Sequence, residues 1–247
     1  MKRLFVDIET SPNIGLFWRA GYKQTITPDS IIEERKVICV SYKWAGGKVK
    51  SLKWDADQDD ATMLAALIKV MNEADEIVAH NGDRFDIKWI RTRCLIHGIR
   101  TYPTYKTVDT LKLAKYGFYF NSNKLDYIAQ LLGVGGKTST NYGMWKDVLL
   151  KNDRKVLNEM VRYCENDVEI LENVYNALAP YCVQKTHVGV EKGLEKWTCA
   201  HCGSERVIGS KQRITALGTP RQQMSCKDCG RYYTISATSY AKYKEAK

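Results

Sequence analysis

Long apolar runs, prolines and low-complexity segments are scarce in this 247-residue chain. The longest segment without Asp, Glu, Lys or Arg is Asn173–Gln184, whose 12 residues include Asn, Tyr and Gln. A membrane-spanning helix needs about 20 mostly apolar residues. With 5 prolines and 44% hydrophobic residues, the composition is that of a packed globular protein and excludes a disordered or fibrous one. The sequence therefore predicts one or two compact domains and no membrane partner.

A secretory signal is also lacking at the start of the chain. The apolar run Leu4–Val6 is followed directly by Asp7, with Glu9 two residues later. These acids come long before an apolar signal segment could form. We therefore expect a cytoplasmic protein.

Acidic residues are outnumbered by basic ones, 28 against 38, which gives a formal net charge of +10. Such an excess favours a polyanionic partner, and nucleic acid is the polyanion we expect. Charge alone describes non-specific binding and solubility, so it does not define a function.

Strand and helix patterns alternate as far as Pro180. Segments rich in β-branched and aromatic residues predict strands at 3–8, 37–45, 48–54 and 76–80, and Gly46-Gly47 predicts a hairpin. Apolar residues at helical spacing predict helices at 60–72, 85–98, 110–116, 125–132 and 153–178. This order predicts an α/β fold in which helices flank a mixed sheet.

The character of the chain changes after Pro180, where clear periodicity ends and a cysteine-bearing, strand-like segment follows. We expect a domain boundary within 181–195, and we divide the chain into domains 1–185 and 186–247. The second domain is too small to build much of a core unaided, so it needs a staple such as a metal.

Five residues in three places suggest metal-dependent chemistry. Asp7 and Glu9 lie two residues apart on a predicted strand and therefore on the same face, where they repel each other unless a cation lies between them. Asp86 opens a helix after a strand, although it could be a plain helix-dipole acid. Tyr163 and Asp167 share one helix face at i, i+4 spacing, although a core tyrosine and a solvated acid are the common alternatives.

The combined order of these motifs is more specific than any one of them. A DxE strand, an NxxxFD segment with Asn81, Phe85 and Asp86, and a YxxxD helix follow one another. This arrangement resembles the DEDD superfamily of 3′-to-5′ exonucleases on a ribonuclease H-like fold, including proteins of bacteriophage and bacterial origin. The tyrosine subtype is the better match, because the histidine subtype has His where this chain has Arg162. The resemblance covers about residues 1–180.

The resemblance implies how the acids act. Two Mg²⁺ or Mn²⁺ ions are held by Asp7, Glu9, Asp86 and Asp167, with Asp7 as the bridging ligand, and Tyr163 orients or deprotonates the attacking water. Such a pair of ions stabilises the attacking and leaving oxygens of phosphodiester hydrolysis, and hard ions prefer carboxylate oxygen.

We therefore expect a 3′-to-5′ exonuclease that acts on nucleic acid, with single-stranded DNA favoured over RNA. The alternatives are a ribonuclease or structure-specific endonuclease on the same fold, or a non-catalytic nucleic-acid-binding or recruitment module.

Substrate contacts are expected near the second motif. Asn81 and Phe85 belong to the motif itself, and Arg84, Lys88 and Arg91 lie on one side of the helix that carries Asp86. Such basic residues can contact phosphates next to the catalytic site, although a solvated helix face is an equally good interpretation.

Other acids have simpler explanations. Asp109 directly precedes a helix and is expected to be its N-cap. The acids of segment 55–60 resemble the start of a calcium loop, but position 6 is Asp60 instead of Gly and position 12 is Ala66 instead of Glu. We interpret them as caps of the helix that follows.

The cysteines fall into two sets. Four lie in apolar segments, where free cysteine behaves as a small hydrophobic residue: Cys39, Cys94, Cys164 and Cys182. The other four form two CxxC pairs, each followed by Gly: Cys199, Cys202, Cys226 and Cys229. Four thiolates complete a tetrahedral Zn²⁺ site, which we prefer to a redox or disulfide role. The segment resembles a zinc ribbon of the kind found in some transposases, and implies one structural Zn²⁺.

Basic and aromatic residues are interleaved in the same segment. They are Arg206, Lys211, Arg213, Arg221, Lys227 and Arg231, with Trp197, Tyr232 and Tyr233. This mixture suits binding of single-stranded nucleic acid. A protein partner for the ribbon is the alternative, since aromatic residues also fill small cores.

Overall fold

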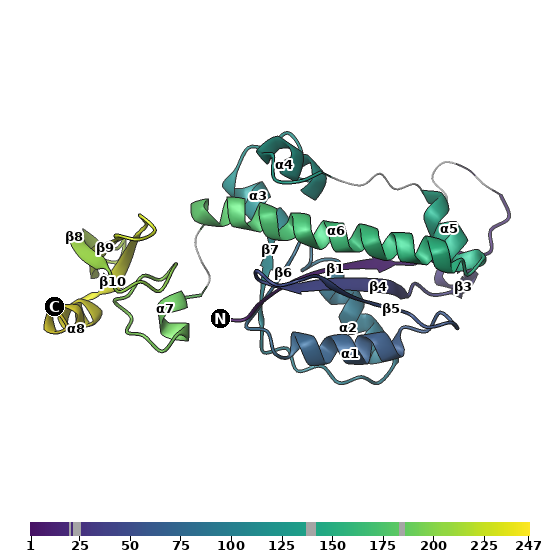
Figure 1. Cartoon of the computed structure of the whole chain (residues 1–247), viewed down its shortest axis with the longest axis horizontal. Coiled ribbons are helices and arrows are strands. Elements are labelled where there is room, and N and C mark those ends of the chain that lie inside the picture. Colours follow the sequence, from purple (N-terminus) through teal and green to yellow (C-terminus); the bar gives the residue numbers. More distant parts are fainter. Residues whose placement is uncertain (20, 22–25, 137–141, 183–185) are drawn as a thin grey trace. The chain divides into compact units, whose positions relative to one another are not determined.

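The computed structural model describes residues 1–19, 21, 26–136, 142–182 and 186–247. Contacts divide the chain into two compact units, Lys2–Tyr181 and Cys182–Lys247, which Figure 1 shows as a larger ribbon from purple to green and a smaller one from green to yellow. We call them the N-terminal and C-terminal units. Residue 185, at the expected domain boundary, lies outside the described residues, so the boundary stays a prediction.

A five-stranded mixed sheet forms the centre of the N-terminal unit. The order is β5-β4-β1-β6-β7, in which β4 is antiparallel to β1 and β5, while β6 and β7 run parallel to β1. The strands are β1 (Arg3–Thr10), β4 (Val37–Trp44), β5 (Lys50–Lys53), β6 (Glu76–Ala79) and β7 (Lys106–Asp109). The expected mixed sheet is confirmed. Strand β7 was not predicted.

Helices cover both faces of this sheet (Figure 1). One face carries α1 (Ala61–Met71) and α2 (Asp86–Ile96), and the other carries α6 (Arg154–Leu178). Around α6 pack α3 (Thr110–Gly117), α4 (Leu125–Leu132) and α5 (Tyr142–Leu150). Helix α5 was not predicted, and the remaining helices confirm the expected ones. Smaller elements are β2 (Ile14–Gly15), β3 (Ile31–Glu33) and the 3₁₀ turns at Pro28–Ser30 and Ala179–Tyr181.

Strand β1 determines which way its acids point. Leu4, Val6 and Ile8 lie in the core beneath α1 and α2, whereas Phe5 packs against residues of α6. Because side chains alternate along a strand, Asp7 and Glu9 share the face of Phe5. Both carboxylates are therefore directed toward α6.

An N-cap fixes the start of helix α6, and an apolar face fixes how the helix packs on the sheet. The Asp153 side chain accepts hydrogen bonds from the backbone N–H groups of Lys155 and Val156, which satisfies donors at the helix start. Buried residues such as Leu157, Met160 and Leu171 follow the helical period along the sheet. This packing places the segment around residue 163 over β1.

The C-terminal unit is built on a three-stranded antiparallel sheet of order β10-β9-β8. Its elements are α7 (Val188–Glu191), β8 (Val207–Ile214), β9 (Pro220–Cys226), β10 (Tyr232–Ser236) and α8 (Ala237–Glu245). The predicted strand-like character of this segment is confirmed by β8, β9 and β10, and the single turn of α7 was not predicted. Trp197, Cys199, Met224 and Ile235 belong to its small core.

Within the described ranges, no helix is long and apolar enough to span a membrane.

Candidate functional site

Three acids from two distant parts of the sequence meet at one place. Oxygens of Asp7 and Glu9 on β1 and of Asp167 on α6 all lie within 4.8 Å of one another. The alternation of β1 and the packing of α6 on it cause this meeting. The sequence predicted one site of four acids, Asp86 included, and the structure brings three of them into this group.

Asp86 joins the cluster from the opposite layer. It is the first residue of α2 and only 2% exposed, and its Oδ1 accepts a hydrogen bond from the Ile8 backbone N–H at 3.2 Å. Ile8 lies between Asp7 and Glu9, so this hydrogen bond holds Asp86 near the other acids, although Asp86 is not in the group within 4.8 Å. Its charge is also a cause of the raised pKa of Asp7.

The carboxylates are crowded and partly shielded from water. Burial, followed by the charges of Asp86, Glu9 and Asp167, raises the pKa of Asp7 well above its usual value. Burial and the charge of Asp109 raise the pKa of Asp86 to about 7, against the lowering effect of hydrogen bonds from backbone N–H groups. A cation among these oxygens relieves the repulsion. An all-carboxylate donor set fits Mg²⁺ or Mn²⁺ better than Zn²⁺.

Tyr163 lies one helical turn before Asp167 and hydrogen bonds to its carboxylate. Burial and the charges of Asp167, Glu9 and Asp7 raise the pKa of the Tyr163 phenol well above its usual value. The phenol is therefore a protonated hydrogen-bond donor at neutral pH. Of the two roles implied by the resemblance, this favours orienting a water over deprotonating it.

Cys164 has a position that sequence reasoning missed. Its Sγ lies 3.4 Å from the backbone oxygen of Asp7 and 3.5 Å from the Asp7 Oδ2, and the residue is fully buried. The thiol supports Asp7 from behind as a weak donor. Its spacing in the sequence resembles that of an ordinary core residue, so no signal distinguished it.

A cleft of about 630 Å³ opens beside Asp167, which forms part of its wall. The other residues that line it are His80, Asn81, Leu111, Asn123, Lys124, Leu125 and Asp126. Of the five expected substrate residues, Asn81 lies here. It adopts a positive φ of 67°, which Asn tolerates, and its backbone N–H donates to Asp109 Oδ1 at 2.9 Å.

His80 connects segments around this cleft by hydrogen bonds. Burial lowers the pKa of His80, so the ring is neutral at neutral pH. Nε2 donates to the Asn123 carbonyl at 2.9 Å, and Nδ1 therefore accepts from the Thr110 hydroxyl, also at 2.9 Å. The end of β6, the start of α3 and the segment before α4 are thereby connected.

The other expected substrate residues lie elsewhere. Phe85 is half-buried and packs against the core beneath α1 and α2. Arg84, Lys88 and Arg91 are exposed and do not line the cleft beside Asp167. A role in contacting substrate stays a prediction for these four residues.

Asp109 is the N-cap of α3, as predicted, with Oδ1 accepting from the N–H groups of Leu111 and Lys112. In segment 55–60, Asp59 accepts from the Ala61 N–H at 2.7 Å. Asp60 occupies the N-cap position of α1, but its side chain makes no cap hydrogen bond. Its carboxylate is fully buried and binds the Arg93 guanidinium instead.

The four CxxC cysteines form a second cluster, in the C-terminal unit. Their sulfurs lie within 4.8 Å of one another, with 3.6 Å between Cys199 and Cys229 and between Cys202 and Cys226. Tetrahedral Zn²⁺ with bonds of about 2.3 Å requires sulfurs about 3.8 Å apart, whereas a disulfide requires about 2.05 Å. Despite burial, hydrogen bonds from the N–H groups of Cys229 and Asp228 lower the pKa of Cys226 to about 7. This donor set fits Zn²⁺.

A mixed sheet with this order, helices on both faces and acids above its central strand is a fold of the ribonuclease H type. Residues 30–179 match a family described as RNase_H superfamily, and the chain belongs to that superfamily. The matched range contains Asp86, Tyr163 and Asp167, and begins after Asp7 and Glu9.

Solved structures share this fold. A family B DNA polymerase from the hyperthermophilic archaeon Pyrobaculum calidifontis superposes with a TM-score of 0.56 at 19% identity, over 72% of this chain and 24% of the polymerase. The chain thus spans about a quarter of the polymerase's length. In total, 102 solved chains are similar, and no curated protein matches the sequence.

Proposed function

We propose that this protein is a divalent-metal-dependent 3′-to-5′ exonuclease of the DEDD type, tyrosine subtype, that hydrolyses single-stranded DNA. The proposal depends on one observation above all. Asp7, Glu9 and Asp167 bring carboxylate oxygens within 4.8 Å of one another, and Asp86 is hydrogen bonded between the first two. This is the donor set that two Mg²⁺ or Mn²⁺ ions need for phosphodiester hydrolysis.

Each residue has a distinct task in this proposal. Asp7 would hold the metal together with Glu9, Asp86 and Asp167, whose charges all act on it. The bound ions supply Lewis acidity for the attacking and leaving oxygens. Tyr163, whose O–H donates to the Asp167 carboxylate, orients the attacking water through its phenol oxygen, and Cys164 holds Asp7 in place. The cleft beside Asp167 receives the terminal nucleotide, with Asn81 in its wall.

Membership of the RNase_H superfamily supports action on a nucleic acid. One similar solved structure is that of a DNA polymerase, which supports DNA over RNA as the substrate. The C-terminal unit is a zinc ribbon with one structural Zn²⁺ on Cys199, Cys202, Cys226 and Cys229. We propose that residues 1–185 form the exonuclease domain and 186–247 the ribbon domain, with the chain acting in the cytoplasm.

The test uses purified protein, Mn²⁺ and oligonucleotides labelled at either end. We expect 5′-labelled single-stranded DNA to give a ladder that shortens from the 3′ end, and 3′-labelled DNA to release its terminal nucleotide at once. Duplex DNA and RNA serve as comparison substrates. A ladder only from RNA, or fragments only from internal cuts, identifies the ribonuclease or endonuclease alternative.

Asp167→Asn provides the matched loss of one acid, and Glu159→Gln on the same helix is its control, because Glu159 is exposed. We expect Asp167→Asn to abolish the ladder and Glu159→Gln to retain it. An absence of hydrolysis from every substrate with intact binding supports the non-catalytic alternative and contradicts the proposal.

A further inference from the structure

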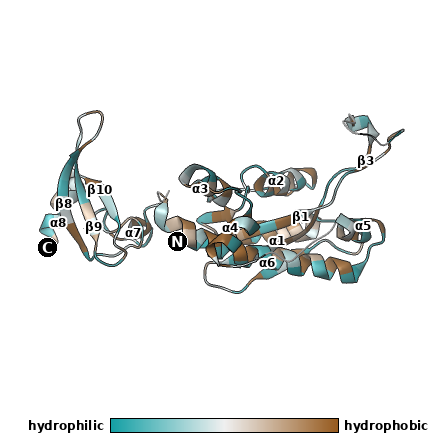
Figure 2. Cartoon of the chain, turned by 90° about the horizontal axis from the view of Figure 1, so that it is seen from above, coloured by the Kyte–Doolittle hydropathy of each residue, from teal (hydrophilic) through white to brown (hydrophobic). Residues whose placement is uncertain are grey.

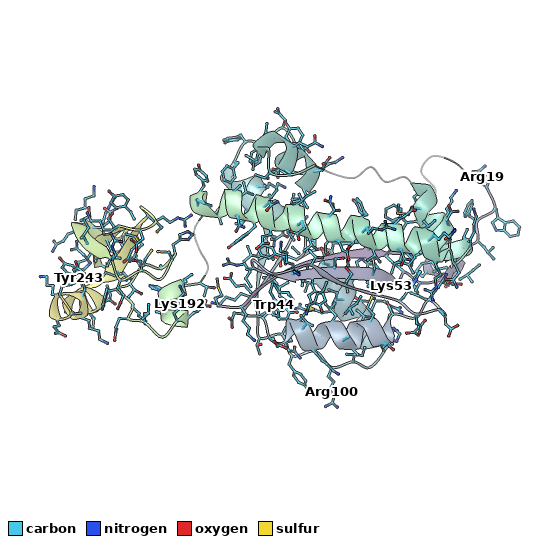
Figure 3. The ribbon with its side chains drawn as sticks, in the orientation of Figure 1. Arg19, Trp44, Lys53, Arg100, Lys192 and Tyr243 are labelled. Carbon is cyan, nitrogen blue, oxygen red and sulfur yellow. The ribbon has the colours of Figure 1, made fainter. Side chains whose placement is uncertain are left out.

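The sheet of the C-terminal unit has two unlike faces. On β9, Gln222, Met224 and Cys226 are buried, and this inner face is covered by aromatic residues of α8, including Tyr243, which is labelled in Figure 3. Residues between them point the other way. Cross-strand pairing assigns their partners to the same outer face, which consists of Ile208, Arg213, Arg221, Gln223, Ser225, Tyr232 and Thr234.

Two arginines face each other on this outer face. Arg213 on β8 pairs directly with Arg221 on β9, and both are exposed. Like charges in direct cross-strand positions destabilise a sheet. Among the described residues neither forms an ion pair, and Arg213 Nε donates to the neutral Gln223 Oε1 at 3.2 Å. The two guanidinium groups are therefore available to bind an anion, and their pairing does not stabilise the sheet.

The surrounding charge has one sign. Strands β8 and β9 contain Lys211, Arg213 and Arg221 and no Asp or Glu, whereas Arg206, just before β8, is ion-paired with Asp228. Figure 2 shows hydrophilic, teal stretches along both strands. Guanidinium groups bind phosphate oxygens through two parallel hydrogen bonds. This surface is thus complementary to a chain of phosphates.

Tyr232 adds an apolar platform to the same face. It is 63% exposed and pairs with Ser225 on β9, beside Ile208, which is 42% exposed. Ser225 is four residues along β9 from Arg221, which corresponds to about 13 Å at roughly 3.3 Å per residue. Phosphate contacts and a stacking platform thus lie a few nucleotides apart, the combination used for single strands.

A groove continues from Arg221 along the free edge of β10. It has a volume of about 430 Å³, and its lining includes His187, Lys196, Arg221, Thr234 and Ser236. Lys196 adds another cation to the path. Hydroxyl groups of Thr234 and Ser236 are further donors of the kind that contact phosphates.

From these features we infer that the outer face of the C-terminal sheet binds single-stranded nucleic acid, with Arg213 and Arg221 on phosphates and Tyr232 stacked on a base. The inference deepens the proposed function, on which it rests for the choice of a polynucleotide. It makes the ribbon a substrate-holding surface.

The test measures binding of the full chain to a fluorescent single-stranded oligonucleotide of about 20 nucleotides, in DNA and RNA versions, without added divalent metal. Arg213→Gln with Arg221→Gln removes two phosphate contacts. We expect the salt slope, d log K/d log [salt], to become about 1.4 less steep, and the affinity to fall about 25-fold at 0.1 M salt. Tyr232→Ala weakens binding about tenfold, and Tyr232→Phe, which keeps the ring, does not.

Lys242→Gln with Lys244→Gln is the matched control, since it removes the same charge from α8 on the inner side of the sheet. We expect nearly unchanged binding. An affinity and salt slope in the arginine variant equal to those of the control overturn the inference, as does equal affinity for duplex DNA. Hydrolysis is measured separately with Mn²⁺, so a chain that binds through Arg213 and Arg221 without cutting contradicts the proposed function alone.

Discussion

The two candidate metal sites differ in how far apart their like-charged ligands lie in the sequence and in the size of the core that supports them. The acid cluster draws Asp7, Asp86 and Asp167 from β1, α2 and α6, which are far apart in the sequence and held by a large core. The four-cysteine cluster comes from two short CxxC segments in a unit with a small core. We therefore expect that the fold of the N-terminal unit creates its site, whereas metal binding at the four cysteines stabilises the fold of the C-terminal unit. The following predictions test this contrast, from the largest effect to the smallest.

Loss of zinc is expected to have the largest effect. Structural Zn²⁺ contributes about 10–16 kcal/mol to the folding of small zinc domains, more than the core around Trp197 can replace. In Cys226→Ser, NMR spectra are expected to lose the dispersed signals of the C-terminal unit and keep those of the N-terminal unit. Cys182→Ser is the control outside the cluster. Dispersed C-terminal signals in Cys226→Ser protein free of zinc contradict this half of the contrast.

Loss of one acid is expected to remove function and spare the fold. In Asp7→Asn, hydrolysis falls roughly 10³-fold or more, because a charge that holds metal is lost. The pKa of Asp7 is raised in the fold, so its ionisation opposes folding; this cost is absent below the ordinary pKa of an unfolded Asp, grows as the pH rises above it, and is complete above the raised pKa. Thermal melting without divalent metal is therefore expected to show Asp7→Asn more stable than wild type at neutral pH. Equal or lower stability there argues against the crowded cluster.

The buried ion pair between Asp60 and Arg93 offers a test of the packing in the N-terminal unit. Burial opposes ionisation of Asp60, but hydrogen bonds from Arg93, the Val37 N–H and His97 outweigh it and lower its pKa. Asp60→Asn leaves the buried Arg93 charge without its partner, at a cost of about 3 kcal/mol. The lowered pKa means that this stability is present above the unfolded pKa and is lost as pH falls through the folded one.

Urea denaturation of Asp60→Asn and wild type at several pH values measures this effect. The difference in the free energy of unfolding is expected to be largest near neutral pH and to shrink below about pH 4. Asp59→Asn, an exposed neighbour, is the control. A difference that stays constant down to pH 2 rules out the assigned ionisation.

Tyr163→Phe is expected to have the smallest of these effects. It removes the hydroxyl that hydrogen bonds to Asp167 and keeps the packed ring, so kcat falls about 10²-fold while Mn²⁺ binding is retained. Tyr175→Phe on the same helix keeps the ring contact with Phe5 and is the control. Unchanged kcat in Tyr163→Phe contradicts the water-orienting role.

The sequence predicted those parts of the molecule that depend on local periodicity. Asp7 and Glu9 share a strand face because they are two residues apart, and Tyr163 and Asp167 share a helix face because they are four residues apart. The order of the motifs in the sequence predicted that Asp86 belongs to the same site. The catalytic role of these residues stays a prediction. The CxxC spacing likewise predicted a cluster of four sulfurs.

Features that depend on packing between distant elements were not predictable. Cys164 lies behind Asp7 only because α6 crosses β1 at that point. Asp60 resembles a helix cap until α2 brings Arg93 to it. The pairing of Arg213 with Arg221 depends on a register shift between Gly209 and Gln212, which sequence alternation alone does not reveal.

The most direct test of the central claim is the number of Mn²⁺ ions bound per chain, measured by titration calorimetry of zinc-loaded protein with a single-stranded oligonucleotide present. Phosphorothioate linkages in the oligonucleotide slow its hydrolysis. We expect two Mn²⁺ ions per chain for wild type and for Glu159→Gln, and fewer for Asp7→Asn, with zinc content unchanged. Equal Mn²⁺ binding by Asp7→Asn and wild type contradicts the claim that the fold of the N-terminal unit creates the metal site.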